Sequence, residues 1–179
     1  MDSLVIRPVV KADLPDLMTL DHSSKSEHVW QLELRREPRM ALVTASFREV
    51  RLPRAIALNY PNDPHALAEA WKRSSMMCAA IAGADTAGYL ALAEPRTGAG
   101  WITDVVVAPK WRRKGIAGAL LEEAHRWCIE RGDRTIFFEM QSKNHPAMML
   151  ARSHGYEFCG YNDRYYSNQD IALLFAHSL

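Results

Sequence analysis

Hydrophobic residues recur along this chain with two different spacings, which predict strands in its first part and alternating strands and helices in its second. Apolar residues stand at every second position, or in short runs, in nine segments. These predicted strands are 4–7, 30–34, 42–50, 77–82, 87–93, 102–108, 135–140, 156–161 and 170–175. The close spacing of 30–34 with 42–50, and of 77–82 with 87–93, predicts two hairpins.

Four helices are predicted where apolar residues return every three or four positions and a proline or glycine marks an end. They cover 11–18, 64–73, 116–131 and 144–154. Polar residues, prolines and glycines between the elements predict a loop or polar helix end at 21–27, a turn at 37–39, an irregular crossing at 51–63 and a turn at 94–100.

The order of elements after residue 101 is strand, helix, strand, helix, and a short crossover of this kind places two parallel strands in one sheet. The pattern predicts a mixed α/β fold that is antiparallel in its first half and has parallel strands in the middle. No repeat, low-complexity tract or linker divides the chain, so we assign residues 1–179 to one domain.

Composition and charge fit a globular protein and argue against a general attraction to nucleic acid or membranes. The 179 residues are 48% hydrophobic and 24% charged, with a formal net charge of +1. The first residues hold no apolar run long enough for a signal peptide or a membrane span, so we expect a cytoplasmic protein. Cys78, Cys128 and Cys159 lie far apart, which indicates neither a disulfide framework nor a metal site.

A short basic turn follows the predicted strand 102–108. Pro109 ends the strand, four of the next five residues are Lys or Arg, and Gly115 then opens a helix. The first N–H groups of a helix lack intrahelical acceptors and carry partial positive charge, and a glycine lets an anion approach the main chain. The turn therefore predicts a phosphate site, with a solvated basic connection as the alternative.

The same residues resemble a known motif. Arg112-x-x-Gly115-x-Ala117, preceded by VVVAP and followed by two leucines, is similar to the acetyl-CoA-binding signature of the GCN5-related N-acetyltransferases (GNAT). A second block, Asn144-x-x-Ala147-x-x-Leu150 followed by Gly-Tyr, resembles the other conserved motif of that family. The opening IRP…ADLP also resembles the family, and the closing run CGYNDRYYSNQDIALLF resembles its streptothricin acetyltransferase branch.

This resemblance implies a fold and a cosubstrate. The fold is a central mixed, mostly antiparallel sheet of six to seven strands, with splayed parallel central strands and helices on both faces. Main-chain amides of 113–118 would hold the pyrophosphate of acetyl-CoA, and the strand before them would pair with its pantetheine arm. The implied cofactor-binding residues are Val105, Val106, Val107, Arg112, Arg113, Lys114, Gly115, Ile116, Ala117, Gly118, Asn144 and Ala147.

The implied chemistry needs a base, because a primary amine is mostly protonated at neutral pH. Glu139 is the first candidate: it interrupts an apolar strand, it stands where some ribosomal-protein acetyltransferases of the family carry an acidic base, and burial would raise its pKa. The alternative is an ion pair with Arg134 or Lys143. Asp104 is the second candidate, with loop orientation or binding of a substrate ammonium as its alternative. Main-chain N–H groups near Val105 or Val106 are candidate oxyanion donors.

The sequence departs from the family at the proton donor, because Ala151 stands where the family has a tyrosine. Either the thiolate leaves without that donor, or another group supplies the proton. Tyr165 is the third catalytic candidate, and Tyr166 and His154 are further candidates by proximity. His154 is otherwise a cation at a helix end. Tyr60 and Trp71 are expected to pack in the core.

The resemblance therefore implies an N-acetyltransferase that transfers acetyl from acetyl-CoA to a primary amine of a small molecule or peptide by direct attack in a ternary complex. A catalytically impaired CoA-binding regulatory or sensor module is the alternative that Ala151 raises. Nucleic-acid binding is poorly supported, since the charge is confined to one turn. Many members of the family associate, which leaves room for a homodimer. Five acidic residues would suit a cationic acceptor if they lined one cleft: Glu27, Glu33, Glu139, Asp163 and Asp170.

Overall fold

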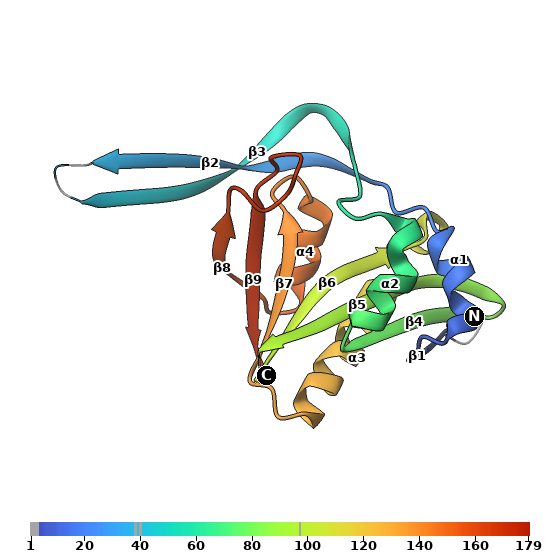
Figure 1. The fold of residues 1–179 in the computed structure, drawn as a ribbon. Coiled ribbons are helices and arrows are strands. Elements are labelled where there is room, and N and C mark those ends of the chain that lie inside the picture. Colours follow the sequence, from blue (N-terminus) through green and yellow to red (C-terminus); the bar gives the residue numbers. More distant parts are fainter. Residues whose placement is uncertain (1–3, 38, 40, 97) are drawn as a thin grey trace.

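A mixed sheet of seven strands forms the centre of the protein (Figure 1). The computed structural model describes residues 4–37, 39, 41–96 and 98–179. Every neighbouring pair of strands is antiparallel except β6 and β7, which are parallel. The predicted fold class is thereby confirmed. The strand order is β1 (Leu4–Pro8), β4 (Met76–Ala82), β5 (Asp85–Arg96), β6 (Ala99–Val107), β7 (Thr135–Gln141), β9 (Ala172–Ser178) and β8 (Glu157–Asn162).

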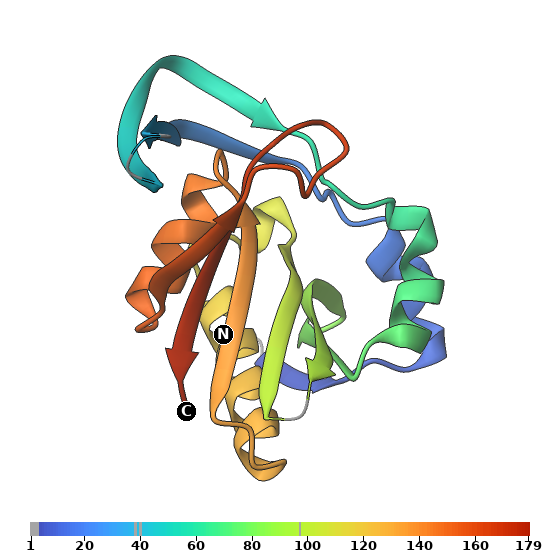
Figure 2. The same cartoon turned by 60° about the vertical axis from the view of Figure 1, so that its left-hand side comes forward.

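Helices cover both faces of this sheet (Figures 1 and 2). Side chains alternate along β5, so that Leu90 and Leu92 join one apolar cluster with α3, while Tyr89 and Ala91 join another with α1 and α2. The helices are α1 (Leu14–Met18), α2 (Leu67–Arg73), α3 (Ile116–Glu130) and α4 (His145–Ser153), with short 3-10 turns at η1 (Lys11–Asp13), η3 (Pro64–Ala66) and η4 (Pro109–Trp111). No helix among the described residues is long and apolar enough to cross a membrane.

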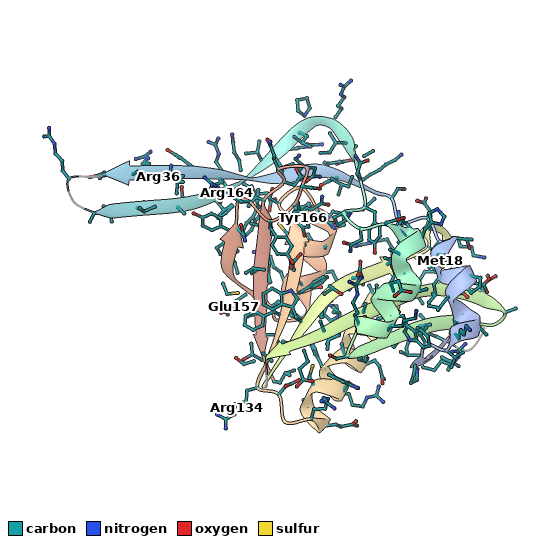
Figure 3. The ribbon with its side chains drawn as sticks, in the orientation of Figure 1. Met18, Arg36, Arg134, Glu157, Arg164 and Tyr166 are labelled. Atoms are coloured by element: carbon teal, nitrogen blue, oxygen red, sulfur yellow. The ribbon has the colours of Figure 1, made fainter. Side chains whose placement is uncertain are left out.

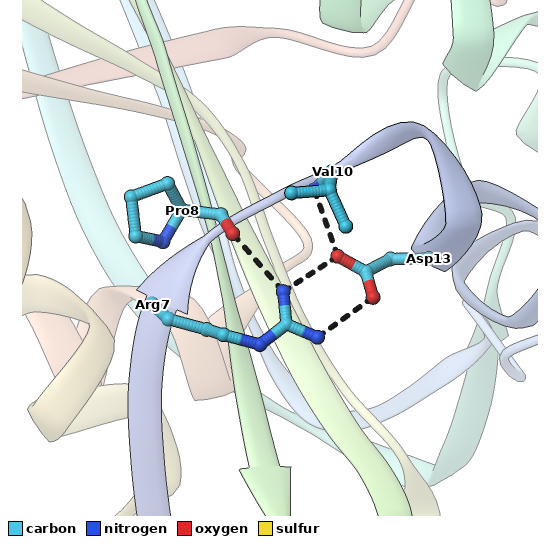
Figure 4. A network of polar contacts seen from close by, with 4 residues as sticks. All are labelled: Arg7, Pro8, Val10 and Asp13. Carbon is cyan, nitrogen blue, oxygen red and sulfur yellow. Dashed lines mark hydrogen bonds and ion pairs between the residues drawn. The ribbon is translucent and has the colours of Figure 1, made fainter.

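An ion pair joins β1 to the start of α1 (Figure 4). Both terminal nitrogens of Arg7 donate to the carboxylate of Asp13 at 2.7 Å, and the main-chain N–H of Val10 donates to the same carboxylate at 2.8 Å. The hydrogen bonds from Arg7 lower the pKa of Asp13, because they favour its charged form. The contact sets the angle at which the chain leaves the sheet.

Strands β2 (Ser24–Glu37) and β3 (Leu42–Leu58) form a separate two-stranded sheet that projects from the body (Figure 1). The predicted hairpin is confirmed, but the loop predicted at 21–27 and the irregular crossing at 51–63 are partly strand. Pro53 misled the prediction, because it lies in a register shift: Ser26 pairs with Ile56, whereas His28 pairs with Arg51. A proline at such a bulge removes no ladder hydrogen bond.

Two further boundaries differ from the prediction. The turn expected at 94–100 is shorter, since β5 continues to Arg96 and β6 begins at Ala99. The last strand begins two residues later than expected, at Ala172. Pro38, in the turn predicted at 37–39, and Thr97, in the turn predicted at 94–100, lie outside the described residues.

The parallel strands β6 and β7 separate halfway along their length (Figure 2). They pair from Ala99 with Thr135 to Ile102 with Phe138, and no further. On its other side β6 carries one extra residue at this point, because Ala91 pairs with Asp104 and Leu92 with Ile102. Such a bulge at Thr103 bends a strand and increases its twist, which turns β6 away from β7.

Candidate active site

The space between the separating strands opens into a cavity of about 700 Å³. Residues from the second half of β6, the basic turn and first helical turn of α3, the end of β7 and the start of α4 line it. The connection after β3 and the chain before β2 close its other side. This lining includes His22, Tyr60, Asp104, Arg113, Gly115, Gly118, Glu139, Asn144, His154 and Tyr166.

The basic turn is shaped by its backbone and held by one arginine. Arg113 and Gly115 both adopt positive φ angles, of 61° and 81°. Arg112 donates from Nε to the carbonyl of Val107 at 2.9 Å and from a terminal nitrogen to that of Ser23 at 2.7 Å. Its guanidinium is thus used to fix the turn, and the exposed Arg113 and Lys114 are the cations left for a ligand.

The first turn of α3 fits a phosphate group. Its first bond to the preceding turn runs from the N–H of Ala119 to the carbonyl of Gly115 at 3.0 Å, so the N–H groups of 116–118 have no intrahelical acceptor. A Cβ atom added at Gly115 would meet nothing within 4 Å, which leaves open space over these donors. At Gly118 an added Cβ would lie 2.8 Å from Nε2 of His154, so glycine permits that close approach. The predicted diphosphate cradle therefore has both the donors and the room.

Asn144, an implied cofactor-binding residue, is the N-cap of α4. Its side-chain oxygen accepts from the N–H of Ala147 at 3.2 Å and caps α4, while both residues also line the cavity. The capped start of α4 therefore borders the cavity between β6 and β7, which the basic turn also lines.

Glu139 lies on β7, partly buried in the cavity wall. The indole Nε1 of Trp101 donates to one of its oxygens at 3.1 Å and the hydroxyl of Tyr166 donates to the other at 3.1 Å. The alternative ion pair with Lys143 is not formed in the described structure, because Lys143 pairs with Asp170. Burial, and then the charge of Glu139, raise the pKa of Tyr166 above its usual range, so this hydroxyl keeps its proton.

Asp104 lies on β6, just past the bulge. It accepts a hydrogen bond from the hydroxyl of Tyr60 and another from Nδ2 of Asn62 at 3.1 Å. Burial raises the pKa of Asp104, and these hydrogen bonds oppose the rise. Tyr60 packs against the apolar cluster of α1 and α2, as expected, and it also lines the cavity. Its position on an irregular connection gave the sequence no period from which to predict the second contact.

The candidate proton donors are placed differently from one another. Tyr165 is 52% exposed and does not line the cavity, and its ring packs edge-on against Tyr166 with centroids 5.1 Å apart. Burial and Glu139 raise its pKa to about 12. Tyr166, beneath the hairpin in Figure 3, and His154 both line the cavity. Ala151 is fully buried in the apolar core.

The acidic cleft that the sequence suggested contains only one of the five acidic residues named for it. Of the five acids named, only Glu139 lines the cavity; Asp170 is buried against Lys143, and Glu33 pairs with Arg35 on the hairpin. Asp104 provides a second carboxylate on the separating strands, and Glu122 lines the cavity from α3. Sequence position alone did not bring Asp104 together with Glu139, because that depends on the splay of the two strands.

Comparisons with known proteins all indicate acetyltransferases. A family model described as the acetyltransferase (GNAT) family matches residues 40–156. A streptothricin acetyltransferase of Streptomyces lavendulae is 37% identical over 65 residues, which is 36% of this chain and 34% of that protein. The matched part is therefore about a third of that relative's length.

Two solved structures share the fold over nearly the whole chain. A nourseothricin acetyltransferase superposes with a TM-score of 0.81 at 23% identity, covering 98% of each chain. A protein from Bacillus anthracis str. Ames described as a streptothricin acetyltransferase, in complex with acetyl coenzyme A, gives a TM-score of 0.80 at 20% identity, covering 99% of each chain.

Proposed function

Because this chain belongs to the acetyltransferase (GNAT) family, we propose that it transfers the acetyl group of acetyl-CoA to a primary amine of a small molecule or peptide. One observation carries the proposal: a single cavity joins the anion cradle at the start of α3 with two carboxylates, Asp104 and Glu139, on the strands that border the splay. A diphosphate at one end and a cationic amine at the other would bring the two reactants together for direct attack.

Acetyl-CoA is the cosubstrate, and when bound it supplies an activated acyl thioester. The N–H groups of 116–118 with Arg113 and Lys114 would hold its diphosphate, and the unpaired edge of β6 past Ile102 would accept its pantetheine arm. Main-chain N–H groups near Val105 or Val106 are the proposed oxyanion donors.

A positively charged acceptor suits the other end of the cavity. Asp104 and Glu139 are acidic, and Tyr60 and Tyr166 add hydroxyl groups that can hold an ammonium. Either carboxylate can take the proton that the ammonium must lose before it attacks. Streptothricin and nourseothricin are the first acceptors to test, since the relatives named above act on them.

A sensor without catalysis has little support in this cavity. Ala151 raised that alternative, but its position faces the apolar core, and Tyr166 and His154 lie at the cavity as other hydroxyl and imidazole groups.

The test is an assay of CoA thiol release with acetyl-CoA and a panel of amines. We expect turnover with a cationic primary amine, and a loss of about 10²–10⁴ in kcat for whichever of Glu139→Gln and Asp104→Asn removes the base, with acetyl-CoA affinity retained. Tight acetyl-CoA binding with no turnover on any amine would favour the sensor instead.

We also propose that the chain forms a homodimer through its hairpin. The register places Leu34, Ala45 and Val43 on the same face as Trp30 and Phe47, which pack against Phe158 of the chain's own β8. This face continues past the body, as the position of Arg36 in Figure 3 shows, and Val43 is 61% exposed. β8 is an edge strand and its Phe158 remains 39% exposed, so a second copy offers the apolar end of the hairpin part of the kind of surface on which its base packs.

Sedimentation of Val43→Asp tests this dimer, with Thr44→Asp on the opposite face as its matched control. We expect the first variant to be monomeric and the second to associate like the wild type; a monomeric wild type contradicts the proposal.

We propose a cytoplasmic location for one domain covering 1–179. Use of acetyl-CoA and three free thiols support the location, and a sheet that takes strands from β1 to β9 supports one domain.

A further inference from the structure

Four side chains from four separate segments form a continuous chain of hydrogen bonds that ends at the cavity. Nε2 of His22 lies 3.1 Å from the hydroxyl of Tyr89, which lies 3.1 Å from the hydroxyl of Tyr60. The hydroxyl of Tyr60 in turn donates to the carboxylate of Asp104. Tyr89, on β5, is fully buried in the apolar cluster of α1 and α2, whereas the other three residues line the cavity.

The contact at the far end fixes the tautomer of the histidine. Nδ1 of His22 lies 2.6 Å from the carbonyl oxygen of Leu20, which can only accept a hydrogen bond. Nδ1 therefore carries a hydrogen, and in the neutral ring Nε2 is an acceptor toward Tyr89.

Counting hydrogens shows that these four hydrogen-bonded side chains can hold one more proton. Three contacts separate His22 from Asp104, but the two tyrosines supply only two hydrogens when the histidine is neutral and the aspartate is ionised. One added proton gives every contact a hydrogen, and it can do so in two arrangements. In the first, His22 is charged and Asp104 is ionised; in the second, His22 is neutral and Asp104 is protonated. The two arrangements interconvert by small shifts of three hydrogens, without movement of heavier atoms.

We infer that Asp104, Tyr60, Tyr89 and His22 form a proton relay that removes the acceptor's ammonium proton from the cavity. This inference rests on the proposed acetyl transfer, and it selects Asp104 over Glu139 as the group that receives this proton. Asp104 is then the catalytic base, and Tyr89 and His22 act through it. Glu139, which has Trp101 and Tyr166 as partners, instead helps to hold the acceptor.

The proton balance of the reaction fits a relay for one proton. The ammonium gives its first proton to Asp104, and the free amine attacks the thioester carbonyl. The new N–C bond forms, the C–S bond breaks, and the second proton of the nitrogen leaves with the sulfur as CoA thiol. One proton is therefore released per turnover; it stays on the relay until the products leave and water enters the cavity that Asp104 and His22 both line.

The surroundings of Tyr60 and Tyr89 keep both hydroxyls protonated, which proton transfer along the relay requires. Burial raises the pKa of both Tyr60 and Tyr89 above the usual range, and the charge of Asp104 adds to the effect in each. The titratable and charged groups that face the relay are Asp21 and Arg112 near His22, and Tyr166 near Asp104.

The decisive variant is Tyr89→Phe, which removes one hydroxyl from the middle of the relay and leaves both ends in place. Tyr156→Phe is its matched control, because Tyr156 is also buried and also contacts a histidine, His125 at 2.7 Å, but lies outside the cavity lining. We expect kcat to fall at least about tenfold in Tyr89→Phe and to change less than about twofold in Tyr156→Phe, with unchanged acetyl-CoA affinity in both.

The pH profile separates a relay from a purely structural role. In the wild type the acid limb of kcat/KM reflects a proton that binds Asp104 and can move along the relay. Once Tyr89→Phe interrupts the relay, that proton can no longer move beyond Tyr60, so the limb should move to lower pH. His22→Gln should shift the limb in the same direction, and it serves as the second variant if Tyr89→Phe is unstable.

The possible failures are distinguishable. A wild-type protein that acetylates no amine would defeat the proposed function itself. A wild type that acetylates an amine, with Tyr89→Phe and Tyr156→Phe alike in kcat and in the acid limb, would defeat the relay alone.

Discussion

The hydroxyl of Tyr166 donates a hydrogen bond to Oε1 of Glu139 over 3.1 Å, although 27 positions separate the two residues. Their meeting follows from the sheet, because β9 pairs along β7 and the chain before β9 passes over the end of the cavity. With Trp101 on the other oxygen, this bond fixes the direction of the Glu139 carboxylate toward any ligand between the strands.

Removal of this hydroxyl should weaken the use of the amine and leave acetyl-CoA binding intact. In Tyr166→Phe the carboxylate loses one of its two donors, so we expect kcat/KM for the amine to fall about tenfold, the effect of about 1.4 kcal/mol. Tyr165→Phe is the comparison, because Glu139 also raises the pKa of Tyr165, but Tyr165 is exposed and lies outside the cavity lining. Steady-state kinetics with varied amine decide the matter; a larger loss in Tyr165→Phe would reverse the assignment.

Gly118 should matter for acetyl-CoA binding because the ring of His154 lies against it. The ring of His154 is held by the carbonyl of Leu150 at 2.9 Å, so a methyl group at residue 118 must displace either this ring or the first turn of α3. We expect Gly118→Ala to weaken acetyl-CoA binding about tenfold, measured by titration calorimetry.

A second change provides the control for that prediction. Gly118→Ala combined with His154→Ala has room for the added methyl group, so affinity should return to that of His154→Ala alone. A double variant as weak as Gly118→Ala would mean that the glycine serves the ligand directly rather than the packing of His154.

The elements of the fold could be predicted because their causes are local. Period-two and helical spacing place seven of the nine strands within a few residues and all four helices, and Pro109 with Gly115 locate the basic turn from the sequence alone. The exceptions are β2, whose first residues resemble a polar loop, and β3, where Pro53 resembles the end of regular structure. A bulge that tolerates proline depends on the partner strand, which no single segment reveals.

Only the acetyl-CoA half of the site could be predicted, because one continuous segment supplies it. The cradle runs from Val105 to Gly118 without interruption, so its motif could be identified. The acceptor side gathers His22, Tyr60 and Tyr89 from separate elements, and their contacts depend on the sheet order and the bulge at Thr103. The neighbours Tyr165 and Tyr166 could not be told apart, because one residue of register decides which ring enters the cavity.

Acid should destabilise the protein through a histidine outside the site. His125 accepts or donates at 2.7 Å to the hydroxyl of Tyr156 and stacks on His177 with ring centroids 5.0 Å apart. Burial lowers the pKa of His125 to about 4, and the charges of His177 and His154 contribute to the same shift. In an unfolded chain the pKa of histidine is about 6.5, so the unfolded state binds this proton at a higher pH than the folded state does.

The stability that depends on a neutral His125 is therefore complete above about pH 6.5 and is lost as the pH falls toward 4. The slope should be a fraction of the about 1.4 kcal/mol per pH unit that a single proton permits, because the half-buried ring is partly solvated. Urea unfolding at several pH values in this window, compared between the wild type and His125→Gln, measures the effect. We expect the wild type to lose stability more steeply than the variant, whereas parallel curves would show that His125 takes up its proton equally well in both states.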